Sequence, residues 1–228
     1  MTTYVLVHGG WAGGWIWRDV AERLRAQGHH VYTPTLTGVG ERSHLISKQI
    51  TLSTHVLDVV NVIKWEELSD IVLAGQSYGG MVITGVTERV PEGAIGSIVY
   101  LDAFLPDNGQ SLADLLPAEG APPEASMDPM PFPGRGRTGN ARIERLVTPQ
   151  PRGPLFEPLT LTGALDRIGR KTYVVTTKWP MPGPTPFSAT AERLAKDPTW
   201  RMEELACGHD MMIEMPEETC QLLLRAAP

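Results

Sequence analysis

The sequence predicts an α/β fold with a mainly parallel central sheet and helices on both faces. Three observations indicate this class. Short apolar runs typical of strands alternate with stretches of helical periodicity through the first hundred residues. The same alternation returns after residue 158. Between the two blocks, the segment 106–158 is crowded with proline, which disfavours both long helices and regular strands.

The first block alternates strands and helices in strict order. The expected elements are strands at 4–7, 30–33, 70–74 and 95–101, and helices at 17–26, 54–68 and 81–90. Gly28 ends the first helix because glycine adopts the left-handed conformation freely, and Pro91 ends the third. A βαβα order implies parallel strands, whose functional groups gather at the carboxyl ends.

The second block completes the same sheet. The expected elements are helices at 159–168, 190–195 and 217–226, and strands at 172–177 and 202–205. We therefore interpret residues 1–228 as one domain, with 106–158 as an insertion within it. An irregular segment this long usually covers a functional site, so we expect 106–158 to form a cap.

Composition disfavours several classes of function. Asp and Glu outnumber Lys and Arg by 26 to 20, so neither nucleic acid nor an anionic membrane is an expected partner. No apolar run approaches the ~18–20 residues that span a bilayer. The first residues read as a strand rather than a signal segment. Cys207 and Cys220 fit neither a disulfide framework nor a zinc pattern. We expect a cytoplasmic protein without metal or cofactor.

A nucleophile motif follows the third expected strand. Residues 75–79 read Gly-Gln-Ser-Tyr-Gly, which matches G-x-S-x-G between a strand and a helix. At this sharp turn the serine oxygen projects above the sheet, near the positive end of the next helix. The pentapeptide also occurs by chance as a structural turn, but the flanking elements and Gly80 favour the nucleophile. Ser77 is therefore the candidate nucleophile.

A serine hydroxyl needs a base to remove its proton. In folds with this motif, the chain order is serine, acid, histidine. Of six histidines only His209 follows Ser77, and it lies in the loop after the last expected strand. We take His209 as the general base rather than a solvated loop residue.

The acid that orients the His209 ring is less directly indicated. Asp102 ends an apolar strand, where an unpaired charge is costly, so we favour it. A capping role for Asp102 remains the alternative. Asp197 is a reserve, and Asp210 adjoins His209 too closely in sequence to orient its ring.

Two backbone N–H groups are expected to form an oxyanion hole. One belongs to Tyr78, directly after the nucleophile, and the other to Gly10 in the glycine-rich loop 8–15. That loop does not match the dinucleotide pattern G-x-G-x-x-G. The expected substrate-binding residues are Trp11, Phe104, Met127, Met130 and Trp179. Such walls suit an apolar or aromatic ester, although the same residues would also serve simply to pack the cap on the body.

Together these motifs resemble the α/β-hydrolase superfamily. Within it the chain resembles the branch of plant methyl-salicylate-type esterases and hydroxynitrile lyases, with their bacterial esterase relatives. The marks are LVHGGWAGGW at 6–15, GQSYGG at 75–80 and Gly208-His209. The likeness runs over 5–105 and from 173 onward, and the cap matches poorly. The resemblance implies ester hydrolysis through an acyl-enzyme.

Two departures from that branch matter. Its plant members place the acid after the penultimate strand, where this chain has Trp179, so the resemblance moves that role to Asp102. The lyases use a first-loop hydroxyl and a lysine directly after the histidine, where this chain has Gly9 and Asp210. An aspartate is the wrong charge for a leaving cyanide. Ser77 likewise excludes the elbow aspartate of epoxide and haloalkane hydrolases.

The sequence therefore predicts a serine esterase that cleaves an apolar or aromatic carboxylic ester, or a lactone, through Ser77. One alternative is a cofactor-independent lyase, cyclase or oxygenase that uses His209 as a base on a carbon acid. Another is a ligand-binding protein on a hydrolase scaffold, which the intact pair of Ser77 and His209 disfavours. The expected partner is a small-molecule ester, and the sequence leaves a homodimer open.

Overall fold

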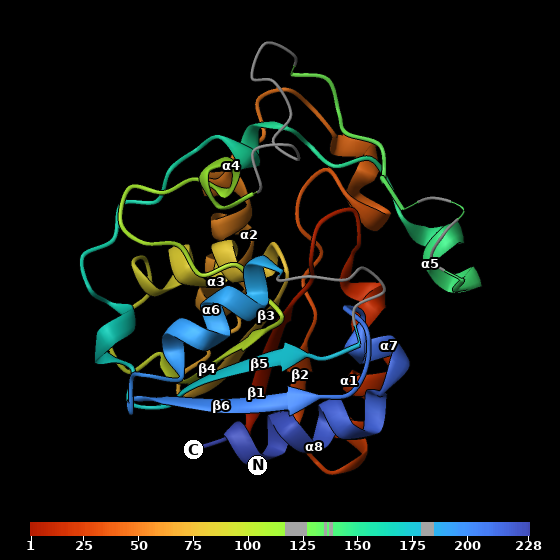
Figure 1. Cartoon of the computed structure of the whole chain (residues 1–228). Helices are drawn as coiled ribbons and strands as arrows, with labels where there is room; N and C mark the ends of the chain where they lie inside the picture. The colour runs from red at the N-terminus through yellow and green to blue at the C-terminus, as the bar shows by residue number, and fades with distance from the viewer. Residues whose placement is uncertain (117–126, 135, 137–138, 179–184) are drawn as a thin grey trace.

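The computed structural model describes residues 1–116, 127–134, 136, 139–178 and 185–228. Its centre is a parallel six-stranded sheet in the order β2-β1-β3-β4-β5-β6 (Figure 1). The strands are β1 (Thr3–Val7), β2 (His30–Tyr32), β3 (Ile71–Gln76), β4 (Ile95–Leu101), β5 (Lys171–Thr176) and β6 (Trp200–Leu205). This sheet confirms the predicted fold class.

Helices cover both faces of the sheet. They are α1 (Arg18–Ala26), α2 (Leu52–Trp65), α3 (Gly79–Thr87), α4 (Leu112–Leu115), α5 (Ala141–Leu146), α6 (Pro186–Leu194), α7 (Met211–Glu214) and α8 (Pro216–Ala226). Short 3₁₀ turns lie at Gly14–Trp17, Gly40–Leu45, Gly153–Leu155 and Leu165–Arg167. Figure 1 shows α1 and α8 below the sheet and α2, α3 and α6 above it. Two apolar cores result, because side chains alternate between the faces of each strand.

The carboxyl ends of all six strands lie at one edge of the sheet. Five non-glycine residues in the described ranges have positive φ, and three of them follow strands at this edge. They are Trp11 after β1 (φ 60°), Ser77 after β3 (φ 55°) and Asp102 after β4 (φ 47°). A left-handed backbone is unfavourable for a residue with a Cβ atom, so neighbouring contacts must hold it. Such strain is concentrated where the candidate nucleophile and acid lie.

The predicted helix at 159–168 is wrong. Only the 3₁₀ turn Leu165–Arg167 forms there, and the preceding residues bind neighbouring segments instead. The N–H of Leu159 donates to the carbonyl of Gln110, and both the N–H and the hydroxyl of Thr162 donate to Glu88. Gly163, with φ 86°, then turns the chain. These long-range hydrogen bonds replace those of the expected helix.

Two buried histidines fix the loops beneath the strand ends. His8 Nε2 accepts a hydrogen bond from the N–H of Leu36 (3.1 Å), so its Nδ1 carries the proton and donates to the carbonyl of Gly9 (2.7 Å). His55 Nε2 lies 2.9 Å from the carbonyl of Thr37, to which only a protonated nitrogen can donate. Its Nδ1 therefore accepts from the Tyr78 hydroxyl (2.8 Å). Both rings are neutral in this arrangement.

Acid is expected to destabilise the fold through these two rings. Burial lowers the pKa of His8 and of His55 from the ordinary 6.5 to about 4. The unfolded chain therefore binds protons at a higher pH than the folded one, and stability falls as pH drops from about 6.5 toward 4. Each histidine should lower the free energy of unfolding by about 2 kcal/mol between pH 7 and pH 5. Urea denaturation at the two pH values measures this loss.

Substitutions separate this effect from general acid sensitivity. His55→Gln should remove about half of the pH-dependent loss, because only His8 then remains to be charged. The matched control is His44→Gln, since His44 is exposed and should leave the loss unchanged. Equal free energies of unfolding at pH 7 and pH 5 in the wild-type protein would contradict the prediction.

Candidate active site

Ser77 stands on a sharp turn between β3 and α3. Its N–H donates to the carbonyl of Leu101 (3.3 Å), and its own carbonyl accepts from the N–H groups of Gly80 (3.0 Å) and Phe104 (3.1 Å). The bonds with Leu101 and Phe104 join the turn to β4 and to the loop that follows β4, and the bond from Gly80 closes the turn itself. They hold the backbone of Ser77 in its left-handed conformation.

The glycines around Ser77 are required by close backbone contacts. A Cβ atom at Gly75 would lie 2.6 Å from the carbonyl oxygen of Gly79, and one at Gly79 would lie 2.8 Å from that of His8. At Gly80 a Cβ atom would overlap the carbonyl oxygen of Phe104. Each distance is shorter than a real Cβ contact. The motif therefore follows from local packing as well as from conformational freedom.

A buried carboxylate holds the ring of His209. Asp102 is fully buried at the end of β4, and its Oδ2 lies 2.7 Å from His209 Nδ1. Thr176, at the end of β5, donates its N–H to Oδ1 (3.2 Å) and its hydroxyl to Oδ2 (3.0 Å). The ring also stacks on Phe187 at 5.1 Å between centroids. Because Nδ1 faces the carboxylate, it carries the proton and leaves the lone pair on Nε2.

Ser77 and His209 line one cavity of about 160 Å³. Its other lining residues are Gly10, Trp11, Ala12, Trp15, Ile16, Gln76, Phe132, Ile143, Val147 and Asp210. The residues at 132, 143 and 147 come from the proline-rich insertion, so this segment lies against the site. By contrast, Asp197 accepts hydrogen bonds from Thr199 just before β6, at the opposite end of that strand from His209. The structure therefore does not bring the reserve acid to the site.

Two backbone amides near Ser77 are available to a ligand. Within the described ranges, no residue accepts a hydrogen bond from the N–H of Gly10 or of Tyr78. Gly10 lines the cavity, and Tyr78 follows Ser77 directly. The side chain of Tyr78 points away into the core, where its hydroxyl meets His55. Tyr78 therefore has only its amide to offer at the site.

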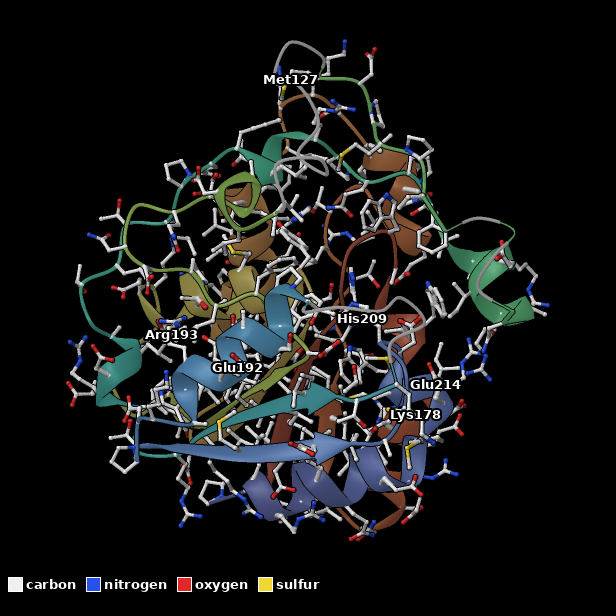
Figure 2. The ribbon with its side chains drawn as sticks, viewed as in Figure 1. Met127, Lys178, Glu192, Arg193, His209 and Glu214 are labelled. Atoms are coloured by element: carbon white, nitrogen blue, oxygen red, sulfur yellow. The ribbon has the colours of Figure 1, made fainter. Side chains whose placement is uncertain are left out.

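The predicted pocket residues differ in where the structure places them. Trp11 lines the cavity. Phe104 instead packs against Phe187 at 4.8 Å, and Met127 lies at the outer rim, far from His209 (Figure 2). Met130 supports the cavity wall from behind, since its carbonyl accepts the indole N–H of Trp11 (3.1 Å). Trp179 lies outside the described residues.

The sequence did not indicate Gln150, which anchors the first loop. Its side-chain oxygen accepts the backbone N–H of Trp11 (3.0 Å), and its backbone pairs with Met130 through two 2.8 Å hydrogen bonds. The N–H of Thr148 donates to the carbonyl of Trp11 (3.0 Å). Phe132 lies edge-on to the Trp11 ring. Trp11 is thus held by Met130, Phe132, Thr148 and Gln150, and these contacts stabilise its left-handed backbone. Thr176 was also not identified from the sequence. The one feature that could have indicated it is a hydroxyl at the end of the strand next to the one that Asp102 follows.

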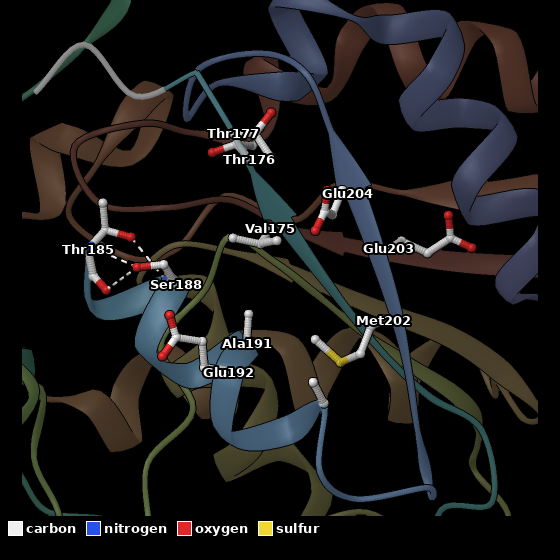
Figure 3. A pocket seen from close by; sticks show the side chains of 11 residues that line it. Val175, Thr176, Thr177, Thr185, Ser188, Ala191, Glu192, Met202, Glu203 and Glu204 are labelled. Atoms are coloured by element: carbon white, nitrogen blue, oxygen red, sulfur yellow. Dashed lines mark hydrogen bonds between the residues drawn. The ribbon is translucent and has the colours of Figure 1, made fainter. Parts of the chain in front are cut away.

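A separate cleft of about 560 Å³ lies between α6 and the strands β5 and β6 (Figure 3). It contains a serine, Ser188, but that hydroxyl donates to the carbonyl of Thr185 as part of the cap of α6. Neither Ser77 nor His209 lines this cleft. Among the described lining residues are the carboxylates Glu192, Glu203 and Glu204 but no histidine. The cleft therefore lacks the pairing that activates a serine.

Other reactive groups near the site are inactive in this structure. Burial raises the pKa of the Cys207 thiol to about 11, so it stays protonated at neutral pH.

In the part of the chain that the structure describes, no three His, Cys, Asp or Glu side chains gather as metal ligands. None of the helices described above has the length and apolar character needed to cross a bilayer.

The chain is similar in sequence to several known proteins. A family model described as "Alpha/beta hydrolase family" matches residues 4–222. A carbendazim hydrolyzing esterase from Nocardioides sp. (strain SG-4G) is 41% identical over 98% of this chain and 98% of its own. Salicylic acid-binding protein 2 from Nicotiana tabacum is 35% identical, but over only 46% of this chain and 40% of its own.

Solved structures show the same fold. An extracellular alpha/beta-hydrolase from a Paenibacillus species superposes with a TM-score of 0.83 and 30% identity, over 100% of this chain and 99% of its own. Polyneuridine aldehyde esterase superposes over the full length of both chains with a TM-score of 0.74. At 21% identity, that second likeness concerns the fold alone.

Proposed function

This chain belongs to the alpha/beta hydrolase family, and from that premise we propose that it is a carboxylic ester hydrolase with Ser77 as its nucleophile. One observation carries the proposal: Ser77 and His209 share a cavity, and His209 is bonded to the buried Asp102. His209 takes the proton of the serine, and Asp102 holds the His209 ring in the tautomer that can do so. The full-length similarity to an esterase supports ester cleavage as the reaction.

The first half of the reaction forms an acyl-enzyme. Ser77 Oγ attacks the ester carbonyl carbon while its proton moves to Nε2 of His209. The resulting oxyanion accepts hydrogen bonds from the N–H groups of Gly10 and Tyr78, which have no acceptor among the described residues. His209 then gives its proton to the leaving alkoxide, and the ester C–O bond breaks.

The second half releases the acid. A water molecule attacks the acyl carbon and passes a proton to His209, which returns it to Ser77 as the acyl–oxygen bond breaks. In both halves Asp102 stabilises the positively charged ring, and Thr176 keeps the carboxylate aligned through two hydrogen bonds. The protein therefore needs no cofactor for this chemistry.

The walls of the cavity support an apolar or aromatic ester. Trp11, Trp15 and Phe132 supply aromatic faces, and Ile143 and Val147 supply aliphatic ones. At about 160 Å³, the space beside Ser77 suits a short acyl chain or one small ring.

Hydrolysis of p-nitrophenyl esters of increasing acyl length tests the proposal. We expect turnover to be fastest for the shortest chains and to fall as the acyl group outgrows the cavity. A fluorophosphonate should label Ser77, located by mass spectrometry, and should stop turnover in a one-to-one ratio. Labelling without turnover would contradict the ester class while supporting the nucleophile. No turnover and no labelling would reject the proposal as a whole.

A further inference from the structure

Asp210 is a carboxylate of the cavity that the ester mechanism leaves unused. It follows His209 directly and lines the same cavity as Ser77. Its side chain makes no capping hydrogen bond to α7, although it is the N-cap residue of that helix. Among the described residues, none donates a hydrogen bond to its carboxylate. The neighbouring carboxylates do have donors. Asp102 accepts hydrogen bonds from Thr176 and His209, and Glu214 accepts one from the N–H of Gly208.

The position of Asp210 is costly for the free protein. Burial raises the pKa of this carboxyl group, and the nearby charges of Glu214 and Asp102 raise it further, while His209 lowers it. This half-buried carboxylate loses part of its hydration, and among the described residues His209 compensates electrostatically while no hydrogen-bond donor does. That cost is recovered when a ligand supplies the missing donor.

The rest of the cavity defines what that ligand carries. Among the described residues that line the cavity, Asp210 is the one carboxylate and none is a lysine or an arginine. The aromatic rings of Trp11, Trp15 and Phe132 line the same space, and those of Trp11 and Phe132 meet edge to face at 6.0 Å. Aromatic faces attract planar groups and cations, and a carboxylate accepts N–H groups.

We propose that Asp210 recognises the substrate by accepting a hydrogen bond from an N–H group on its aromatic part. The substrates are then aromatic esters that bear a nitrogen donor such as an amidine, an amine or a carbamate N–H. This inference rests on the proposed esterase function, because it assigns a ligand contact in the same cavity. It also gives a reason why the residue after His209 is an aspartate.

Three ring-matched inhibitors test this role. Benzamidine carries a cationic N–H donor, benzamide a neutral one, and benzoate an anion of similar size. Inhibition constants are measured against p-nitrophenyl acetate for the wild type, Asp210→Asn and the control Asp197→Asn. The control removes the same charge from a distant turn before β6. The readout is the ratio of the constants for benzamide and benzamidine, which is independent of any change in the basal rate.

We expect benzamidine to bind most tightly to the wild type and benzoate least. Asp210→Asn should weaken benzamidine about 10-fold or more relative to benzamide, the usual effect of losing a hydrogen bond to a charged group. Asp197→Asn should leave the ratio unchanged. If wild type hydrolyses p-nitrophenyl acetate but Asp210→Asn keeps the wild-type ratio, this inference is wrong and the esterase function stands.

Failure of the esterase function would be recognised separately. In that case the wild type neither turns over p-nitrophenyl acetate nor reacts with a fluorophosphonate, and thermal stabilisation by benzamidine replaces inhibition as the readout. The same comparison of variants then decides the role of Asp210. Asp210→Ser provides the substitution if circular dichroism shows that Asp210→Asn does not fold.

Discussion

Ser77→Ala is expected to lower kcat for p-nitrophenyl acetate by at least about 10⁴-fold, because no acyl-enzyme can form without the hydroxyl. The remaining rate would come from the oxyanion donors and from binding alone. Alanine removes one oxygen and keeps the turn, whose hydrogen bonds are made by the backbone of residue 77. The protein should therefore fold normally, and steady-state kinetics with a thermal melt checks both points.

The matched control is Ser188→Ala, since Ser188 lies in the cleft beside α6 and its hydroxyl caps that helix. This variant should keep the wild-type rate. The comparison also separates the alternative functions. A lyase that uses His209 on a carbon acid would keep much of its activity in Ser77→Ala, and a pure binding protein would have no activity to lose. More than about a tenth of the wild-type esterase rate in Ser77→Ala would exclude the acyl-enzyme.

Asp102→Asn is expected to lower kcat by about 10³–10⁴-fold. An asparagine fits the same space but offers an N–H group where His209 now donates, so the ring takes the wrong tautomer and its Nε2 loses the lone pair. The thermal melt shows whether loss of the charge also weakens the bonds from Thr176. Steady-state kinetics across pH 6–9 measures the rate at each protonation state of the ring.

Asp197→Asn is the matched control for this variant, because Asp197 is the carboxylate that sequence alone kept in reserve. Among the described residues its carboxylate accepts hydrogen bonds from Thr199 alone, far from His209, so this change should leave kcat within about two-fold. A loss of less than about 10-fold in a well-folded Asp102→Asn protein would show that Asp102 does not orient the base.

The strands and the residues at their ends were predictable from sequence for a physical reason. A buried parallel strand is a continuous apolar run, bounded by residues that cannot continue it, as in β4, where the predicted and observed limits coincide. Once the strand ends are known, parallel order brings the loops after them together. Ser77, Asp102 and His209 follow from that order without any knowledge of side-chain contacts.

The cavity walls were not predictable in the same way, because they depend on the path of the insertion. Phe104, Met127 and Met130 have the right chemistry for a pocket, yet they pack elsewhere. The hydrogen bond between Gln150 and Trp11 joins residues that are 139 positions apart in the chain, and no pattern in the sequence predicts it. The failed helix at 159–168 has the same origin, since long-range partners outcompeted local hydrogen bonds.

The attachment of the first loop to the segment 130–150 has an evolutionary consequence. Gly10 precedes Trp11, and Trp11 is fastened to Gln150, Met130 and Thr148. Under the proposed function, a mutation that displaces Met130, Thr148 or Gln150 to admit a new substrate also moves the Gly10 amide, the proposed oxyanion donor. A mutation that changes the substrate range is therefore expected to change the turnover rate as well. New substrate specificity in such a lineage then requires a second mutation that restores the position of the amide.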